Sequence, residues 1–235
     1  MSTPWGGSSP GPQNLLSDVE FAENPEPRCP CILLLDTSGS MSGGAIQSLN
    51  EGLISLRKDL TLDKIAERRV EVAIVTFGGD VRVLQDFVTA DSFAPPILEA
   101  NGETPMGTSI LTALDLLERR KEVYKLHGLQ YYRPWLFLIT DGKPQGEPAG
   151  TYDRAMQRIK EDQGRNKLIY FPIGVEGADM QLLARNSPTP PRKLFGLRFI
   201  ELFRWLSASL KSISSSRPGE QAILPPTDPW AIITS

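Results

Sequence analysis

The strongest constraint on the fold is a pair of short apolar runs in which polar and apolar residues do not alternate. Residues 32–35 read Ile-Leu-Leu-Leu, and residues 135–140 read Trp-Leu-Phe-Leu-Ile-Thr. Runs of this length without a polar face are typical of strands that are buried on both sides of a sheet. Each run is followed at once by an aspartate, Asp36 or Asp141, and by a loop that contains glycine. Helices must then cover both faces of the sheet, which predicts an α/β fold.

Segments with strand and helix patterns alternate along the rest of the chain. We expect strands at 32–35, 70–77, 81–84, 135–140, 168–173 and 193–195. We expect helices at 45–60, 105–126, 152–162, 179–184 and 199–213, with Thr104 as the N-cap of the second helix and Pro105 as its first residue. The turn before 81–84 is short enough for a hairpin, so that strand should be antiparallel. The prediction is a doubly wound α/β fold with a mostly parallel six-stranded sheet and one antiparallel edge strand.

The chain divides into one domain and two tails of different composition. Residues 1–27 begin with a stretch rich in Ser, Gly and Pro, which cannot bury enough apolar surface to offset its ordering entropy. We therefore expect this extension to be partly disordered and residues 1–14 to be removable with little loss of stability. Residues 28–213 hold every predicted strand and helix. Residues 214–235 are rich in Ser and Pro, but four apolar residues there could dock on the domain: Leu224, Trp230, Ile232 and Ile233.

The composition bears on which classes of partner the protein binds and on where in the cell it is located. The chain has 25 Lys and Arg against 28 Asp and Glu, a formal charge of −3, which does not indicate binding to nucleic acid or to an anionic membrane. No basic stretch leads into an apolar run near the N-terminus, and no apolar run is long enough to span a bilayer, so we expect a cytoplasmic protein. Cys29 and Cys31 are expected to be reduced thiols, because no further Cys or His cluster completes a metal site.

Oxygen-bearing side chains follow the two apolar runs. After the first run the chain reads Asp36-Thr37-Ser38-Gly39-Ser40. If this segment stays extended, the two-residue period directs Asp36, Ser38 and Ser40 to one side. In doubly wound sheets, ligands bind at the carboxyl ends of the strands near the point where the strand order reverses. We therefore expect these three side chains to form part of a ligand site.

Two further oxygen groups should join this site. Asp141 follows the strand that should lie beside the first one, and Thr104 lies at the start of a helix in the connection between them. The set contains oxygen ligands and neither nitrogen nor sulfur, which suits Mg²⁺, Mn²⁺ or Ca²⁺ and argues against Zn²⁺ or Cu²⁺. Because only two carboxylates are present, Mg²⁺ or Mn²⁺ is expected rather than Ca²⁺.

These residues resemble the metal-ion-dependent adhesion site of von Willebrand factor A (vWA) domains. That site consists of a D-x-S-x-S loop, a distant Thr and a distant Asp, which match Asp36 to Ser40, Thr104 and Asp141. The resemblance covers roughly residues 28–213 and implies the vWA fold. It implies that Ser38 and Ser40 coordinate the ion directly and that Thr104 does so directly or through water. It also implies that the two aspartates act largely through waters. Thr108 is the rival of Thr104, but it should lie one turn inside the helix.

Within this family the local sequences resemble the bacterial tellurium-resistance, or TerY-like, vWA proteins. The matching segments read CPCILLLDTSGSM, GETPMGTSIL and LITDG, together with SSSRPGE near the end of the chain. This resemblance implies a binding module in a bacterial stress or defence system, with other tellurium-resistance proteins, a protein kinase and a phosphatase among its partners. The charge count of the site leads us to expect that a protein partner supplies an Asp or Glu to the metal.

The competing hypothesis is an enzyme. Asp36 could act as the nucleophile of a metal-dependent phosphatase or phosphotransferase, but the motif of that class needs a second Asp where Ser38 stands. A serine hydrolase is less compatible still, because the chain has no G-x-S-x-G motif and only one histidine, His127. We therefore expect no catalytic residues and a function in binding.

Overall fold

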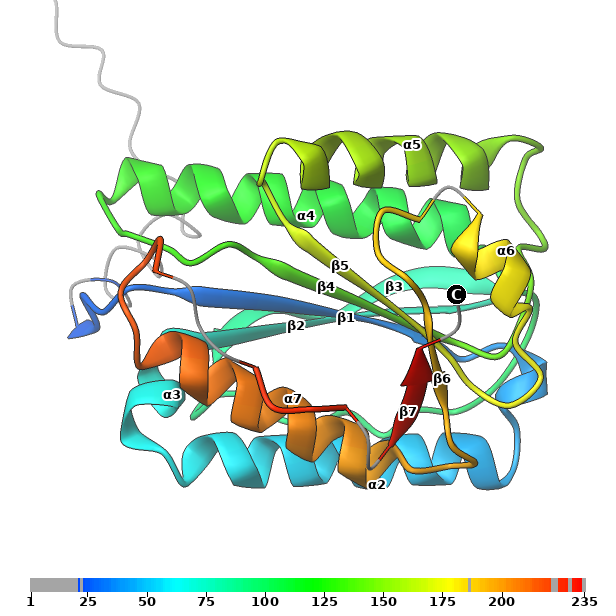
Figure 1. Ribbon diagram of the computed structural model, residues 1–235, viewed down its shortest axis with the longest axis horizontal. Coiled ribbons are helices and arrows are strands. Elements are labelled where there is room, and N and C mark those ends of the chain that lie inside the picture. The colour runs from blue at the N-terminus through cyan, green and yellow to red at the C-terminus, as the bar shows by residue number, and fades with distance from the viewer. Residues whose placement is uncertain (1–20, 22, 186, 221–223, 228–229, 234–235) are drawn as a thin grey trace, which may run out of the picture.

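The protein is a single sheet between two layers of helices (Figure 1). The computed structural model describes residues 21, 23–185, 187–220, 224–227 and 230–233. The strands run in the order β3-β2-β1-β4-β5-β6-β7. They span Cys29–Asp36 (β1), Val70–Gly78 (β2), Asp80–Thr89 (β3), Trp135–Thr140 (β4), Ile169–Gly174 (β5), Arg192–Leu194 (β6) and Ala231–Ile233 (β7).

The helices divide between the two faces of the sheet. Helices α4 and α5 cover one face, and α2, α3 and α7 cover the other (Figure 1). Their bounds are Gly44–Thr61 (α2), Lys64–Arg69 (α3), Met106–Leu126 (α4), Thr151–Gly164 (α5), Met180–Ala184 (α6) and Phe199–Ser214 (α7), with a 3₁₀ turn at Gly39–Met41 (η1). Among the described residues, none of these helices is both long enough and apolar enough to cross a lipid bilayer.

The predicted fold class is confirmed, with additions that the sequence did not reveal. Five strands are parallel, and β3 is the antiparallel edge strand after a tight turn, as expected. A seventh strand, β7, pairs antiparallel with β6 and forms the opposite edge. Helix α3 was not predicted, because six residues are too few to show a helical period. Its start is nevertheless encoded locally, since the Asp63 carboxylate accepts hydrogen bonds from the amides of Ile65 and Ala66.

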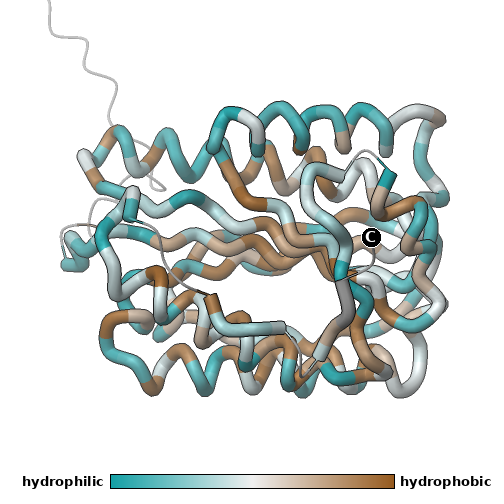
Figure 2. Tube along the Cα trace, in the orientation of Figure 1, coloured by the Kyte–Doolittle hydropathy of each residue, from teal (hydrophilic) through white to brown (hydrophobic). Residues whose placement is uncertain are grey.

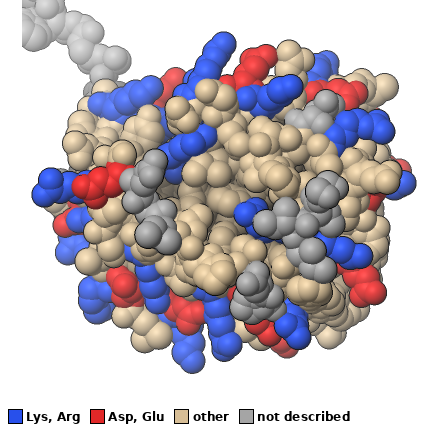
Figure 3. All heavy atoms as spheres, in the orientation of Figure 1, with Lys and Arg blue, Asp and Glu red and all other residues tan. Residues whose placement is uncertain are grey.

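Burial of the central strands on both faces is confirmed. Side chains of β1 alternate between two apolar clusters, with Leu33 and Leu35 packing toward α2 and α7 and Ile32 and Leu34 packing toward α4 and α5. The apolar stretches of the chain accordingly gather in the middle of the molecule (Figure 2). On the outer face shown in Figure 3, basic and acidic side chains are interspersed around the rim.

The described part of the C-terminal segment packs on the same core as α7. The Trp230 side chain is buried, with its ring centre 5.3 Å from that of Trp205. Leu224 packs against the same cluster, and the Trp205 indole donates a hydrogen bond to the Pro225 carbonyl at 2.8 Å. Ile232 lies in β7, opposite Lys193 of β6. The described residues after 214 therefore contribute to the sheet and its core.

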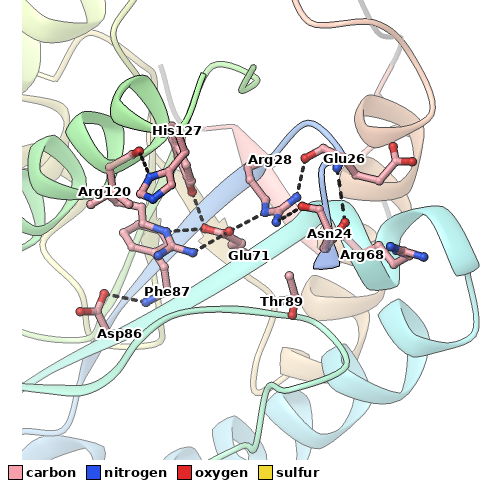
Figure 4. A network of polar contacts seen from close by, with 12 residues as sticks. Asn24, Glu26, Arg28, Arg68, Glu71, Asp86, Phe87, Thr89, Arg120 and His127 are labelled. Carbon is pink, nitrogen blue, oxygen red and sulfur yellow. Dashed lines mark hydrogen bonds and ion pairs between the residues drawn. The ribbon is translucent and has the colours of Figure 1, made fainter. Parts of the chain in front are cut away.

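A buried ion-pair network lies at the end of the sheet where β1 and β2 begin (Figure 4). Glu71 of β2 is fully buried between the guanidinium groups of Arg28 and Arg120. The Tyr124 hydroxyl donates a further hydrogen bond to the same carboxylate. The ring of Phe21 lies about equally close to both guanidinium groups, at 5.3 and 5.1 Å. Arg28 also donates to backbone carbonyls of the segment before β1, so that segment is attached to the domain.

The prediction that residues 1–14 can be removed with little loss of stability concerns a part of the chain outside the described residues.

Both cysteines are free and buried at the start of β1. Burial raises the pKa of Cys29 to about 12, with a further contribution from the negative charge of Glu71. Burial also raises the pKa of Cys31 well above its usual value. Because the thiolate is the reactive form, we expect neither thiol of the native protein to react with an aromatic disulfide reagent at pH 7.5. Both should react in guanidinium chloride. Rapid reaction of either thiol before unfolding would contradict this prediction.

Candidate metal site

The candidate metal site lies at the carboxyl ends of β1 and β4. These strands are parallel neighbours, and the chain proceeds from β1 to β2 on one side and to β4 on the other. The strand order therefore reverses between β1 and β4, where doubly wound sheets bind their ligands. The site occupies the right-hand end of the sheet in Figure 1, where η1 and the first turn of α2 also lie.

The loop after β1 brings Asp36, Ser38 and Ser40 together, although not in the extended form that we expected. The backbone is extended as far as Ser38 and then turns through η1. Local backbone hydrogen bonds close this turn, and the Gly39 amide donates a further one to the Gly102 carbonyl, 63 residues away, at 3.0 Å. The Ser38 and Ser40 hydroxyl oxygens still lie 3.1 Å apart, and the Asp36 carboxylate accepts from the Ser38 amide at 2.8 Å.

The loop after β4 closes the site from the other side. The Ser40 hydroxyl donates to Asp141 Oδ1 at 2.8 Å, which joins two loops that are 101 residues apart. Thr140, the last residue of β4, donates from its hydroxyl to Asp36 Oδ2 at 2.5 Å. Each of the two carboxylates thus accepts a hydrogen bond from a hydroxyl group, Asp36 from Thr140 and Asp141 from Ser40.

Thr104 is the fifth predicted residue, and its hydroxyl faces the same place. A Cβ atom built on Gly142 would lie 3.3 Å from Thr104 Oγ1 and 3.6 Å from Asp36 Oδ2, so both oxygens border the Gly142 backbone. Thr108 lies in a different environment, because its amide and its hydroxyl both donate to the Glu147 carboxylate, at 2.7 and 3.0 Å. The structure therefore brings all five predicted residues together, whereas Thr108 is hydrogen-bonded to Glu147.

The predicted start of α4 was wrong by one residue. The helix begins at Met106, with Pro105 rather than Thr104 at the N-cap. The reason lies in a distant residue, since the Glu147 carboxylate accepts from the amides of Gly107 and Thr108 and caps the first turn. The Thr104 side chain is therefore not needed as a cap.

The two carboxylates of the site lie close together, and one of them is buried. Asp36 is fully buried, and burial raises the pKa of its carboxyl above the usual value, as does the nearby Asp141. Hydrogen bonds from Ser38 and Thr140 act in the opposite direction. Among the described residues, no Lys, Arg or His forms an ion pair with either aspartate. Buried charges are otherwise paired or coordinate metals, so a divalent cation fits this donor set.

Glycines hold the loops of the site closely together. A Cβ on Gly78, the last residue of β2, would lie 2.1 Å from the Thr37 carbonyl oxygen, within the site loop. Gly102 has a φ of 76° and would place a Cβ 2.5 Å from Gly79 Cα. Sequence reasoning did not identify Gly78, Gly102 or Thr140. For Thr140 the available signal was its place directly before Asp141 at the end of a buried strand.

The family comparison covers most of the chain. The family model for the von Willebrand factor type A domain matches residues 31–198. A curated relative, inter-alpha-trypsin inhibitor heavy chain H4 of Sus scrofa, is 32% identical over 122 residues. That match includes 48% of this chain and only 12% of the relative, so the chain spans a small part of that protein.

Solved structures show the same fold at low sequence identity. The pilus adhesin SpaC from Lactobacillus rhamnosus GG superposes with a TM-score of 0.63 and 11% identity, over 79% of this chain and 30% of the adhesin chain. Proximal thread matrix protein 1 from the mussel byssus gives a TM-score of 0.53 and 16% identity, over 79% of this chain and 48% of its own. A further structure of that byssus protein, described as having a zinc-occupied MIDAS motif, gives 0.53 and 15% over the same shares. With the family model matching residues 31–198, the chain belongs to the von Willebrand factor type A domain family.

Proposed function

We propose that this domain binds a divalent cation at the candidate metal site and uses the bound ion to recognise a protein partner. The observation that carries the proposal is the buried carboxylate of Asp36, which lies beside a second carboxylate, Asp141, and has no basic side chain as ion-pair partner in the described part of the chain. Metal-dependent binding between proteins is also the general role of vWA domains. The proposed ligands, direct or through water, are Asp36, Ser38, Ser40, Thr104 and Asp141.

Mg²⁺ or Mn²⁺ is the proposed ion. The donor set is entirely oxygen, with three neutral hydroxyls and two carboxylates, which favours these ions over Ca²⁺. Zn²⁺ should be tested for binding beside Mg²⁺ and Mn²⁺, because the byssus protein of similar fold has been described with a zinc-occupied MIDAS motif. Among the described residues there is no cluster of three or more His, Cys, Asp and Glu, so the proposed site depends on hydroxyl oxygens together with its two carboxylates.

We expect saturating Mg²⁺ or Mn²⁺ to raise the melting temperature of the protein. A ligand that binds only the native state adds about 2.7 kcal/mol to the free energy of unfolding at 100 times its Kd. Asp141→Ala should abolish this shift and leave the melting temperature in EDTA close to that of the wild type. Asp153→Ala, which removes an exposed carboxylate from α5, is the matched control and should keep the full shift. A full shift in Asp141→Ala would show that the site is misplaced.

A carboxylate of the partner is the proposed final ligand. Two aspartates balance a divalent ion formally, and the three hydroxyls are neutral, so the ion keeps its affinity for an anion. Mg²⁺ retains water where the protein offers no ligand, and an incoming Asp or Glu can replace such a water. The N-termini of α2 and α4, at Gly44 and Met106, add positive potential at this end of the sheet. Metal and partner should then raise each other's affinity by the same factor.

The proposed biological setting rests on the resemblance to TerY-like proteins. We propose a cytoplasmic role in bacterial stress or tellurite resistance, with other tellurium-resistance proteins, a protein kinase or a phosphatase as partners. The support is the agreement of the segments around Asp36, Thr104 and Asp141 with that group. Capture of partners from the native host on the immobilised chain, with Mg²⁺ and with EDTA, tests this. Partners that bind equally in EDTA would contradict a metal-dependent role.

The phosphotransferase hypothesis fits the geometry less well. Asp36 is fully buried, so its carboxylate is not exposed to an incoming phosphoester, and Ser38 stands where that class needs a second Asp. Incubation with Mg²⁺ and generic phosphoesters distinguishes the two functions. Sustained turnover that Asp36→Asn abolishes would overturn the binding-module proposal.

A further inference from the structure

Thr140 makes two hydrogen bonds at the end of β4, and their directions are fixed by chemistry. Its side chain is fully buried. The Gly142 amide lies 3.1 Å from Thr140 Oγ1, and an amide nitrogen can only donate, so the hydroxyl accepts there. The single hydroxyl proton is therefore available for Asp36 Oδ2, at 2.5 Å. One side chain thus connects the loop after β1 with the loop after β4.

These bonds fix the orientation of the Asp36 carboxylate. Oδ1 accepts from the Ser38 amide, and Oδ2 accepts from Thr140. Each oxygen keeps a second lone pair for an ion or for a water bound to an ion. The bond from Gly142 holds the backbone beside Asp141 in the same arrangement. Rotation of the Asp36 carboxylate would break the bond from Ser38 or the bond from Thr140.

We propose that Thr140 is a positioning residue of the metal site, which acts by orienting Asp36 and the loop that carries Asp141. The inference rests on the proposed function, because it assumes that a cation binds there. Thr140 is not itself a proposed ligand, since it is buried and its hydroxyl is already engaged with Asp36 and Gly142. Groups that orient metal ligands typically contribute about 10- to 100-fold to metal affinity.

The test is a calorimetric titration of the full chain with Mg²⁺ and with Mn²⁺ alone. Thr140→Val keeps the shape of the side chain and removes the hydroxyl, so the Kd should rise by about 10- to 100-fold. Thr140→Ser keeps the hydroxyl and should restore most of the affinity. Thr76→Val removes another buried hydroxyl, from β2 on the other side of β1, and should bind the ion like the wild type.

Melting temperatures in EDTA separate positioning from general stability. If Thr140→Val does not fold, Thr140→Ser and Thr140→Cys provide a second comparison, because they have similar shapes and a thiol is a weak donor. Thr140→Cys should then bind the ion more weakly than Thr140→Ser. Wild-type affinity in Thr140→Val or Thr140→Cys, alongside a wild-type chain that binds the ion, would overturn this inference alone. A wild-type chain that binds neither ion would overturn the proposed function together with the inference.

Discussion

Replacing Glu71 by alanine is expected to lower the free energy of unfolding by about 3–5 kcal/mol, the range measured when one partner is removed from a buried ion pair. Glu71 and Arg28 are both fully buried, and Arg120 approaches the carboxylate with two nitrogens, at 2.7 and 2.9 Å. Without Glu71, the guanidinium groups of Arg28 and Arg120 would both lose the carboxylate that they share, and that of Arg28 is fully buried. The loss should be measured by urea unfolding.

Two further variants serve as a control and as a conservative comparison for Glu71→Ala. Glu51→Ala removes an exposed carboxylate from α2 and should change stability by no more than about 0.5 kcal/mol. Glu71→Gln keeps the shape and one hydrogen-bond acceptor, and it should fall between wild type and Glu71→Ala. A loss below about 1 kcal/mol in Glu71→Ala would mean that the network contributes no more than an exposed ion pair does.

The second large effect is expected from Trp230→Ala, which should destabilise the protein by about 3–5 kcal/mol, as removal of buried aromatic side chains does. Trp230 is only 1% exposed and lies against Trp205. Its indole nitrogen has no hydrogen-bond partner among the described residues, so the loss should come from packing. Trp230→Phe, which fills much of the same space, should recover part of the stability.

Truncation after Ser216 provides an independent test of the same contact. The shortened chain loses β7 and the Trp230 side chain, and it should melt below the full chain. Its unfolding should also show a smaller dependence on urea concentration, because less surface is exposed on unfolding. A truncated chain that melts like the full chain would contradict the contribution of this segment to the core.

The strands could be predicted where both faces are buried. The bounds of β4 agree with its apolar run, because a buried strand needs apolar side chains in both directions. The prediction for β3 was too short, since its exposed edge position and irregular register leave no clean alternation. β7 has only three residues, and its place depends on pairing with β6 rather than on its own sequence.

In the candidate site, too, some features follow from the local sequence and others depend on residues far away in the chain. Asp36 and Asp141 could be located because each directly follows a buried strand. The turn at Gly39–Met41 could not, because its first amide, that of Gly39, donates to the distant Gly102 carbonyl. The role of Thr140 likewise depends on the parallel pairing of β1 with β4, which places its hydroxyl beside an aspartate 104 residues away. Local sequence identified the oxygen donors, and tertiary contacts determine their orientation.

The hydrogen-bonded chain from Ser38 through Ser40 to Asp141 has a consequence for the kinetics of ion uptake. The hydroxyl groups already lie within 3.1 Å of their neighbours, so a cation needs them to rotate and not the loops to move. Such preorganisation reduces the conformational entropy lost on binding. Loss of water from the ion, rather than rearrangement of the protein, should then limit the rate. Mn²⁺, which exchanges its water faster than Mg²⁺, should accordingly enter the site sooner.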